Sequence, residues 1–131
     1  MCGIAGFISL CQPIDHPKTH LDSALKKLNK RGPDAVGIYR DENCELGHTR
    51  LSILDTSNAA NQPMVSENKR YTIIFNGEIY NFDILGIDLE KKYGVNIKTS
   101  SDTEVLLNGL ILEGKSFIEK LNGFFAFCFY D

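Results

Sequence analysis

The sequence predicts a single domain of mixed α and β layers. Two features carry this prediction: short apolar runs typical of strands come in pairs, and amphipathic segments of about ten residues, typical of helices, stand between them. The chain has 131 residues with no internal repeat, low-complexity segment or linker, which is a common size for one domain with one core. We therefore expect residues 1–131 to form one α+β domain.

The first third of the chain predicts a strand followed by a helix. Residues 2–10 are a short apolar run that predicts a buried strand, and Pro13 and Pro17 mark the loop after it. Leucine and alanine recur at helical spacing over residues 21–28, with lysines on the other faces. Residues 31–34, Arg-Gly-Pro-Asp, are expected to end this helix in a tight turn.

Two further strands are predicted before the middle of the chain. Residues 36–40 and 45–50 read as strands around the polar turn 41–43. The apolar alternation continues over residues 51–55. A loop rich in Ser, Asn, Ala and Pro is then expected over residues 56–63.

The next strand and helix are marked by strong local signals. Residues 71–75 are β-branched and aromatic and predict a strand that ends at Asn76-Gly77. Residues 82–93 predict a helix that Gly86 interrupts and Gly94 ends.

The last third predicts a short strand and then more helix. The strand is expected over residues 95–99. Ser101 and Glu104 have the spacing of a capping box, which opens a helix over residues 105–112. Two elements complete the chain: a second short helix over residues 117–121 and an apolar strand over residues 124–130.

Charge and hydropathy exclude several classes of partner. The chain has 14 basic and 17 acidic side chains with no basic run, which argues against binding to nucleic acid or to an anionic membrane surface. No apolar run approaches the ~20 residues of a membrane span, and no signal-peptide pattern is present. We expect neither a membrane nor a nucleic-acid partner.

The cysteine and histidine patterns indicate a reduced, metal-free protein. The four cysteines include no CxxC pair, and without an export signal we expect free thiols in a cytoplasmic protein. His16 and His20 flank Pro17 and lack a nearby Glu, so no zinc site is expected.

Cys2 is the residue with the clearest catalytic potential. If Met1 is removed, Cys2 carries both a thiol nucleophile and a free α-amine that can take its proton. The alternative is that Cys2 packs as a small hydrophobic residue, as free cysteines commonly do.

The Asn76-Gly77 pair has two interpretations. After a strand, Asn-Gly is a strong signal for a type I′ hairpin turn. Alternatively, the Asn76 carboxamide and the Gly77 backbone N–H would donate hydrogen bonds to an oxygen that gains negative charge when an amide is attacked.

For three charged or titratable side chains, a purely structural role is an alternative to a role in binding or catalysis. Arg50 follows a strand and would be either a surface group or a bidentate ligand for a carboxylate. Asp102 lies where a helix begins, and the helix dipole alone favours a carboxylate there. His48 lies within a strand and is expected to be structural, because an N-terminal nucleophile needs no imidazole base.

Seven segments, in order along the chain, together resemble a known family. They are Met-Cys-Gly-Ile-Ala-Gly-Phe at 1–7, Arg-Gly-Pro-Asp at 31–34, Gly-His-Thr-Arg-Leu-Ser-Ile-Leu-Asp at 47–55, Gln-Pro at 62–63, Asn-Gly-Glu-Ile-Tyr-Asn at 76–81, Ser-Asp-Thr-Glu-Val at 101–105 and Leu-Asn-Gly-Phe-Phe-Ala-Phe at 121–127. The chain resembles the glutaminase domain of class II glutamine amidotransferases, in the branch of the glutamine-hydrolysing asparagine synthetases.

The resemblance implies a fold and a set of residue roles. The fold is the N-terminal-nucleophile hydrolase type, two stacked antiparallel-rich sheets between helical layers (αββα), expected to be incomplete at the C-terminus. The roles run as follows: Cys2 as nucleophile with its α-amine as base, Asn76 and Gly77 as oxyanion hole, Arg50 for the substrate carboxylate, Asp102 for its ammonium, and Glu78, Leu51 and Ile53 lining the pocket.

The resemblance also implies a reaction and its partners. Glutamine would be hydrolysed to glutamate and ammonia through a thioester, and the ammonia would pass to a synthetase domain that lies outside these residues. No cofactor is expected in this domain; ATP and Mg²⁺ would serve only the synthetase domain. Alternatives are a truncated, non-catalytic glutamine-binding or interaction module and an ammonia acceptor other than aspartate. The aromatic residues 124–130 are expected to leave an unpaired sheet edge that allows a homodimer.

Overall fold

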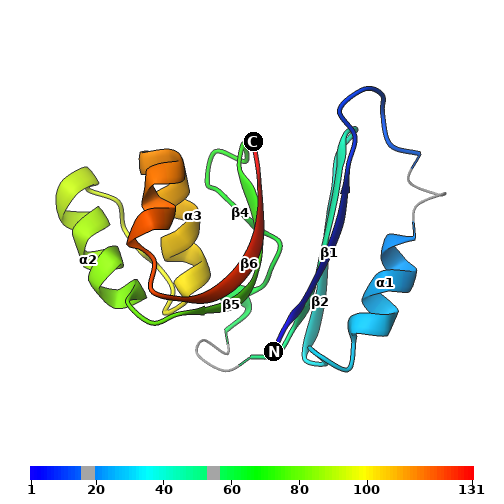
Figure 1. Ribbon diagram of the computed structural model, residues 1–131, viewed down its shortest axis with the longest axis horizontal. Coiled ribbons are helices and arrows are strands. Elements are labelled where there is room, and N and C mark those ends of the chain that lie inside the picture. The colour runs from blue at the N-terminus through cyan, green and yellow to red at the C-terminus, as the bar shows by residue number, and fades with distance from the viewer. Residues whose placement is uncertain (16–19, 53–56) are drawn as a thin grey trace.

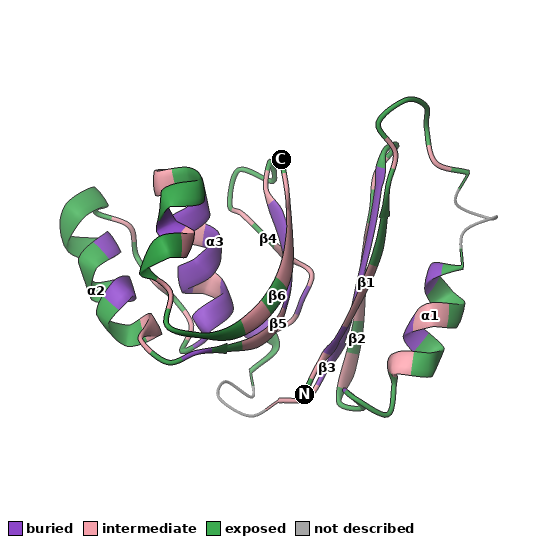
Figure 2. Ribbon diagram, viewed as in Figure 1, coloured by how far each residue is buried: buried purple, intermediate pink, exposed green. Residues whose placement is uncertain are grey.

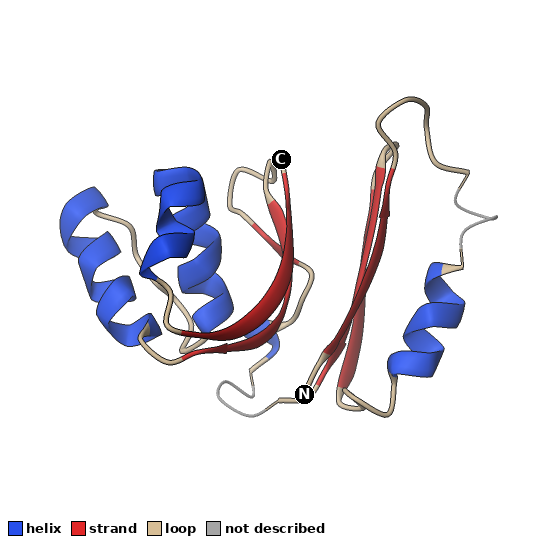
Figure 3. Cartoon of the chain, in the orientation of Figure 1, coloured by secondary structure: helices blue, strands red, loops and turns tan. Residues whose placement is uncertain are grey.

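The computed structural model describes residues 1–15, 20–52 and 57–131. Its two sheets each have three antiparallel strands, in the orders β1-β3-β2 and β4-β5-β6. The sheets face one another, with α1 outside the first and α2 and α3 outside the second (Figures 1 and 3). The predicted α+β layer order is therefore confirmed. The expectations on His16, Pro17 and residues 53–56 lie outside the described residues.

The first sheet and its helix come from the N-terminal part of the chain. Their elements are β1 (Gly3–Ile8), α1 (Leu21–Leu28), β2 (Ala35–Arg40) and β3 (Cys44–Arg50). The central strand β3 pairs with β1 from Gly3↔Thr49 onward and with β2 from Ala35↔Arg50 onward. Because side chains alternate along a strand, β3 presents Thr49 to α1 and Arg50 to the second sheet.

The second sheet and its helices hold the larger core. Their elements are η2 (Asn58–Ala60), β4 (Met64–Val65), β5 (Thr72–Ile79), α2 (Phe82–Tyr93), α3 (Asp102–Glu113), η3 (Gly114–Lys120) and β6 (Gly123–Tyr130). One apolar cluster fills the space between sheet and helices: Ile73, Phe75, Ile79, Leu85, Leu89, Val105, Leu106, Leu107, Leu110 and Phe117. α3 is buried over most of its surface, because it lies between this sheet and α2 (Figures 1 and 2).

A smaller contact joins the two sheets. Leu46 of β3 and Ile74 of β5 form a buried apolar cluster together with Cys44. At one end, Asp41 in the β2–β3 turn accepts hydrogen bonds from the hydroxyls of Tyr39, at 3.0 Å, and Tyr130, at 3.3 Å. The Tyr130 hydroxyl therefore ties this turn to the last strand, and the Tyr39 hydroxyl holds the turn against β2.

The strand predicted over residues 71–75 is longer than expected. β5 continues through Asn76 and Gly77, which pair with Ala126 and Phe125 of β6. The hairpin interpretation of Asn76-Gly77 is therefore wrong. A Cβ on Gly77 would lie 2.3 Å from the carbonyl oxygen of Phe124, so this glycine allows close strand approach and does not form a turn.

The strand predicted over residues 95–99 does not form. Three backbone N–H groups in this stretch donate to side-chain carboxylates: Ile97 to Glu90, and Lys98 and Thr99 to Glu104. Their hydrogen-bonding capacity is thus met without a neighbouring strand, so extended pairing brings no further gain.

The capping box predicted at Ser101 and Glu104 is only half present. The Ser101 hydroxyl accepts from the backbone N–H of Thr103 at 3.2 Å and caps α3 as expected. The Glu104 carboxylate does not reach back to Ser101; it accepts from the Thr99 N–H at 2.7 Å and from the Thr99 hydroxyl at 2.7 Å.

Two short elements differ from the prediction. The helix expected over residues 117–121 is a 3-10 helix, η3, that begins at Gly114, whose φ of 63° ends α3. The two-residue strand β4 follows the expected loop 56–63, in a stretch for which no element was predicted, because Met64 and Val65 are too short a run to predict a strand.

The packing of Phe117 against α3 gives a stability prediction. A Cβ on Gly109 would lie 2.2 Å from the Phe117 ring, whereas one on Gly86 would lie 3.3 Å from Val105. Gly109→Ala should lower the free energy of unfolding by about 1–3 kcal/mol through overpacking, even though alanine favours a helix. Gly86→Ala, the matched control, should stay within about 1 kcal/mol of wild type. Urea denaturation measures both, and equal stability of the two variants would contradict the packing argument.

Candidate active site

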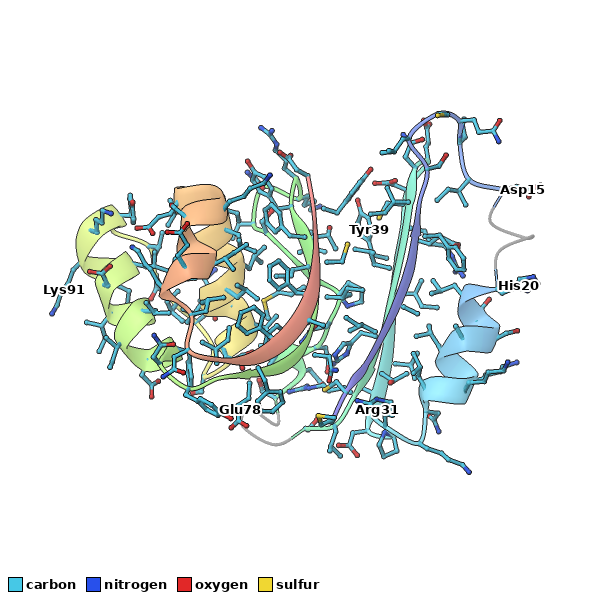
Figure 4. All side chains as sticks on the ribbon, in the orientation of Figure 1. Asp15, His20, Arg31, Tyr39, Glu78 and Lys91 are labelled. Carbon is cyan, nitrogen blue, oxygen red and sulfur yellow. The ribbon has the colours of Figure 1, made fainter. Side chains whose placement is uncertain are left out.

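A cavity of about 160 Å³ lies where the N-terminus meets the second sheet. Figure 4 shows the labelled Glu78 and Arg31 at this same end of the two sheets, near the N-terminus marked in Figure 1. The residues that line the cavity are Met1, Cys2, Arg50, Leu51, Ser52, Ala60, Gln62, Phe75, Asn76, Gly77, Glu78, Ser101, Asp102, Thr103 and Phe124.

The structure brings the predicted site residues together. Those that line the cavity are Cys2, Arg50, Leu51, Asn76, Gly77, Glu78 and Asp102. Ile53 lies outside the described residues. Residues from both sheets and from the start of a helix thus meet at one cavity, although they are up to 100 positions apart in the sequence.

Cys2 is half-buried and is held by two neighbours. Its Sγ accepts a hydrogen bond from the Leu51 backbone N–H at 3.4 Å, and such a donor stabilises negative charge on sulfur. The Arg31 Nε donates to the Cys2 carbonyl oxygen at 3.0 Å. Side chain and backbone of the first residues are therefore both fixed, and Cys2 does not pack as a simple apolar residue.

The Arg-Gly-Pro-Asp turn is the scaffold of this arrangement. Asp34 donates its backbone N–H to the Arg50 carbonyl at 2.9 Å and accepts from the Ser52 N–H at 2.8 Å. A Cβ on Gly32 would lie 2.3 Å from the Thr49 carbonyl oxygen, so only glycine lets the turn approach β3 this closely. The sequence predicted the turn but not its role in holding the site. The signal for that role was that residues 31–34 are one of the segments that carry the family resemblance.

Arg50 is buried rather than exposed. Its side chain follows the inward face of β3, and the residue is only 7% exposed. The Nη1 atom donates to the Ser57 carbonyl at 2.7 Å and to the Asn61 Oδ1 at 2.6 Å. The surface interpretation is therefore wrong, and these two acceptors fix the guanidinium where it reaches the cavity.

Asp102 is a buried carboxylate at the first residue of α3. Its Oδ2 accepts from the Ile79 backbone N–H at 3.2 Å. Burial raises the pKa of Asp102, the hydrogen bonds from the backbone of Ile79 and Thr103 oppose this, and negative Glu78 adds to the rise. The helix N-terminus further favours the ionised form.

Asn76 contributes a polar side chain to the cavity wall. It lies on β5 and lines the cavity, and within the parts of the chain that the structure describes its carboxamide oxygen accepts no hydrogen bond. Buried polar groups are usually satisfied by the fold, so this oxygen keeps the capacity to accept a hydrogen bond inside the cavity.

Sequence reasoning missed several polar residues of the cavity wall. They are Ser52, Gln62, Ser101 and Thr103. For Gln62 a signal existed, because Gln62-Pro63 is one of the segments that carry the family resemblance. Ser101 and Thr103 lie in another of these segments, residues 101–105.

Across residues 1–15, 20–52 and 57–131 no group of three or more His, Cys, Asp or Glu side chains is arranged to hold a metal ion. None of the helices in those residues is long and apolar enough to cross a membrane.

Comparison with known proteins decides the family. Residues 1–131 match the family described as a glutamine amidotransferase domain. The chain belongs to the glutamine amidotransferase domain family. It is 37% identical over 133 residues to asparagine synthetase [glutamine-hydrolyzing] 3 of Bacillus subtilis and 37% identical over 132 residues to asparagine synthetase B of Escherichia coli. Both alignments cover all of this chain but only 21% and 23% of those relatives.

A solved structure supports the fold assignment of this amidotransferase domain. Glutamine phosphoribosylpyrophosphate amidotransferase from B. subtilis, complexed with ADP and GMP, matches with a TM-score of 0.57 and 28% identity, over 68% of this chain and 21% of that one. The fold is thus of the N-terminal-nucleophile hydrolase type, as the resemblance implied.

His48 lies beside this site without lining it. It is 1% exposed, and its side chain follows the inward face of β3. Burial lowers the pKa of His48 to about 4, and the positive charge of Arg50 acts in the same direction. The residue is therefore neutral at pH 7, in line with a structural role.

The buried His48 predicts acid sensitivity of the fold. The unfolded chain binds a proton at His48 below pH about 6.5 and the folded chain only below about 4. Stability is therefore fully present above pH 6.5 and is lost as the pH falls toward 4, by up to about 3 kcal/mol. His48→Leu should remove this part of the pH dependence, which urea denaturation at pH 7, 5.5 and 4.5 measures. Parallel pH profiles of wild type and variant would contradict the argument.

Proposed function

We propose that this domain hydrolyses glutamine to glutamate and ammonia, with Cys2 as the nucleophile. The observation that carries the proposal is one cavity that collects a thiol, a guanidinium, a buried carboxylate and a carboxamide: Cys2, Arg50, Asp102 and Asn76. The names of the curated relatives, glutamine-hydrolysing asparagine synthetases, point to the same reaction.

The charges of the cavity match those of a free amino acid. Glutamine carries a carboxylate and an ammonium on one carbon and a primary amide at the other end. Arg50 would bind the carboxylate and Asp102 the ammonium, in a partly buried site where ionic hydrogen bonds are strong. Glu78 and the backbone around Leu51 and Ile53 would line the same pocket.

The reaction needs no group beyond the chain and water. The Cys2 thiol gives its proton to the α-amine freed by removal of Met1, and the thiolate adds to the amide carbon of glutamine. The resulting oxyanion collapses, the C–N bond breaks, and the α-ammonium returns the proton to the departing nitrogen, which releases ammonia. Water then adds to the thioester carbonyl, and the C–S bond breaks to give glutamate and the thiol.

Asn76 and Gly77 would stabilise the oxyanion. The Asn76 carboxamide and the Gly77 N–H are the donors that we assign to it, and each such donor contributes about 3–4 kcal/mol in the transition state. β5 pairs with β6 at these two residues, which holds the strand that carries both donors in place.

The ammonia would be used by a synthetase domain of the asparagine-synthetase type. The chain spans about a fifth of the length of the relatives it matches, so this partner is part of the proposal. ATP and Mg²⁺ would act only in that domain. A cytoplasmic location and a homodimer remain predictions.

The nucleophile assignment is tested by substitution and labelling. Cys2→Ala should abolish ammonia release from glutamine while leaving the melting temperature unchanged, because the thiol supplies the attacking atom. Cys44→Ala and Cys128→Ala, which alter thiols outside the cavity, are the controls and should remain active. Chains that retain Met1 should be inactive because their Cys2 nitrogen is an amide. Labelling by an electrophilic glutamine analogue at Cys11, Cys44 or Cys128 would refute the assignment.

Substrate recognition and transition-state stabilisation should separate kinetically. Arg50→Ala and Asp102→Asn should raise the KM for glutamine strongly, and Arg50→Lys should rescue poorly because the paired donors are lost. Asn76→Ala should lower kcat by about 10²–10³-fold with little change in KM. Steady-state kinetics with ammonia detection measures each constant. Equal use by wild type of glutamine and of a simple uncharged primary amide would rule out the charge-pair assignment.

A further inference from the structure

A continuous chain of hydrogen bonds links β5 to Asp102. The Phe75 backbone N–H donates to the Gln62 Oε1 at 2.6 Å, and the Gln62 Nε2 donates to the Thr103 Oγ1 at 3.0 Å. The Thr103 hydroxyl then donates to the Asp102 Oδ1 at 3.4 Å. Gln62 is 8% exposed and Thr103 is 2% exposed, so neither can exchange these partners freely for water.

The chemistry of each group fixes the direction of this chain. A backbone N–H can only donate, so the atom of Gln62 that faces Phe75 must be the carbonyl oxygen. The amide nitrogen therefore faces Thr103, and an NH₂ group likewise can only donate. The Thr103 oxygen accepts that bond, which leaves its hydrogen for the Asp102 carboxylate.

We propose that Gln62 and Thr103 are positioning residues that hold the Asp102 carboxylate in place for the ammonium group of the substrate. With the Ile79 N–H on Oδ2 and the Thr103 hydroxyl on Oδ1, each carboxylate oxygen has a donor. Rotation of the carboxylate would break both bonds. The inference rests on the proposed function, which gives Asp102 its ligand.

This series of hydrogen bonds also keeps the buried Asp102 carboxylate charged. Three donors, the backbone N–H groups of Ile79 and Thr103 and the Thr103 hydroxyl, favour the ionised carboxylate against the effect of burial. The other charged or titratable groups that line the cavity are the Cys2 thiol, the Arg50 guanidinium, the Glu78 carboxylate and the terminal amine of Met1. Of these, Glu78 opposes ionisation, so removal of the hydroxyl donor should raise the pKa of Asp102.

Substitution at Thr103 isolates the hydroxyl. Thr103→Val keeps the shape and removes the donor, and Thr103→Ser keeps the donor as the matched control. Binding is measured by calorimetry at pH 6 and pH 8 in a Cys2→Ala background, with two ligands: L-glutamine and 5-amino-5-oxopentanoate, which is glutamine without its α-amine. Thr103→Val should weaken glutamine binding about tenfold, more at pH 6 than at pH 8, and the deaminated ligand by less than twofold. Thr103→Ser should match wild type.

A second variant reverses the direction of the hydrogen bond between residue 62 and Thr103. Gln62→Glu keeps the acceptor for the Phe75 N–H but places a second acceptor toward Thr103, so the hydroxyl should turn away from Asp102. It should reproduce the effect of Thr103→Val on glutamine while sparing the deaminated ligand. Equal weakening of both ligands by both variants, or no weakening of either, would overturn the proposal.

A measurement without ligand tests the role of the Thr103 hydroxyl separately from the proposed function. Carbon-13 NMR of the Asp102 carboxyl should show a higher pKa in Thr103→Val than in wild type and no rise in Thr103→Ser. An unchanged pKa in Thr103→Val would overturn the role of the hydroxyl. Failure of the proposed function shows differently: wild type would then bind neither ligand, whatever the NMR titration reports.

Discussion

The hydrogen bonds that fasten the first residues to the end of β3 are the contact on which the site depends. Leu51 donates to the Cys2 sulfur, and Arg31 donates to the Cys2 carbonyl. The N-terminus of a chain is usually poorly ordered unless something ties it down. Here β1 pairs along β3, and the turn at residues 31–34 holds both strand ends together, so a residue next to the terminus acquires a fixed position.

Arg50 and Asp102 are two buried charged side chains that line the cavity, and the fold supplies hydrogen-bond partners to each. An ionised side chain removed from water costs several kcal/mol unless the protein replaces the lost hydrogen bonds. Arg50 receives two acceptors from the segment 57–61, and Asp102 receives donors from Ile79 and Thr103. The fold thus keeps both groups oriented toward a cavity where a zwitterion would complete their pairing.

The sequence predicted the layers and the grouping of site residues better than it predicted local details. Helix and strand periodicity depends on burial, which is why residues 21–28 and 82–93 form the expected helices. Asn76-Gly77 failed as a turn because pairing with β6 outweighed the local preference. The role of Thr103 could not be predicted, since the direction of its hydroxyl depends on Gln62, 41 positions away. Only the fold brings those two side chains into contact.

Arg50 and Asp102, the two charges proposed to bind the substrate, belong to different halves of the molecule. Arg50 extends from the first sheet, whereas Asp102 begins a helix packed on the second. A molecule held by both would act as a cross-link between the halves. Any ligand that binds only the docked arrangement stabilises it by mass action, in proportion to the logarithm of its concentration above Kd. The contact between the two sheets, to which the small apolar cluster at Leu46 and Ile74 and the Asp41 contacts contribute, would thereby be coupled to the concentration of the proposed substrate.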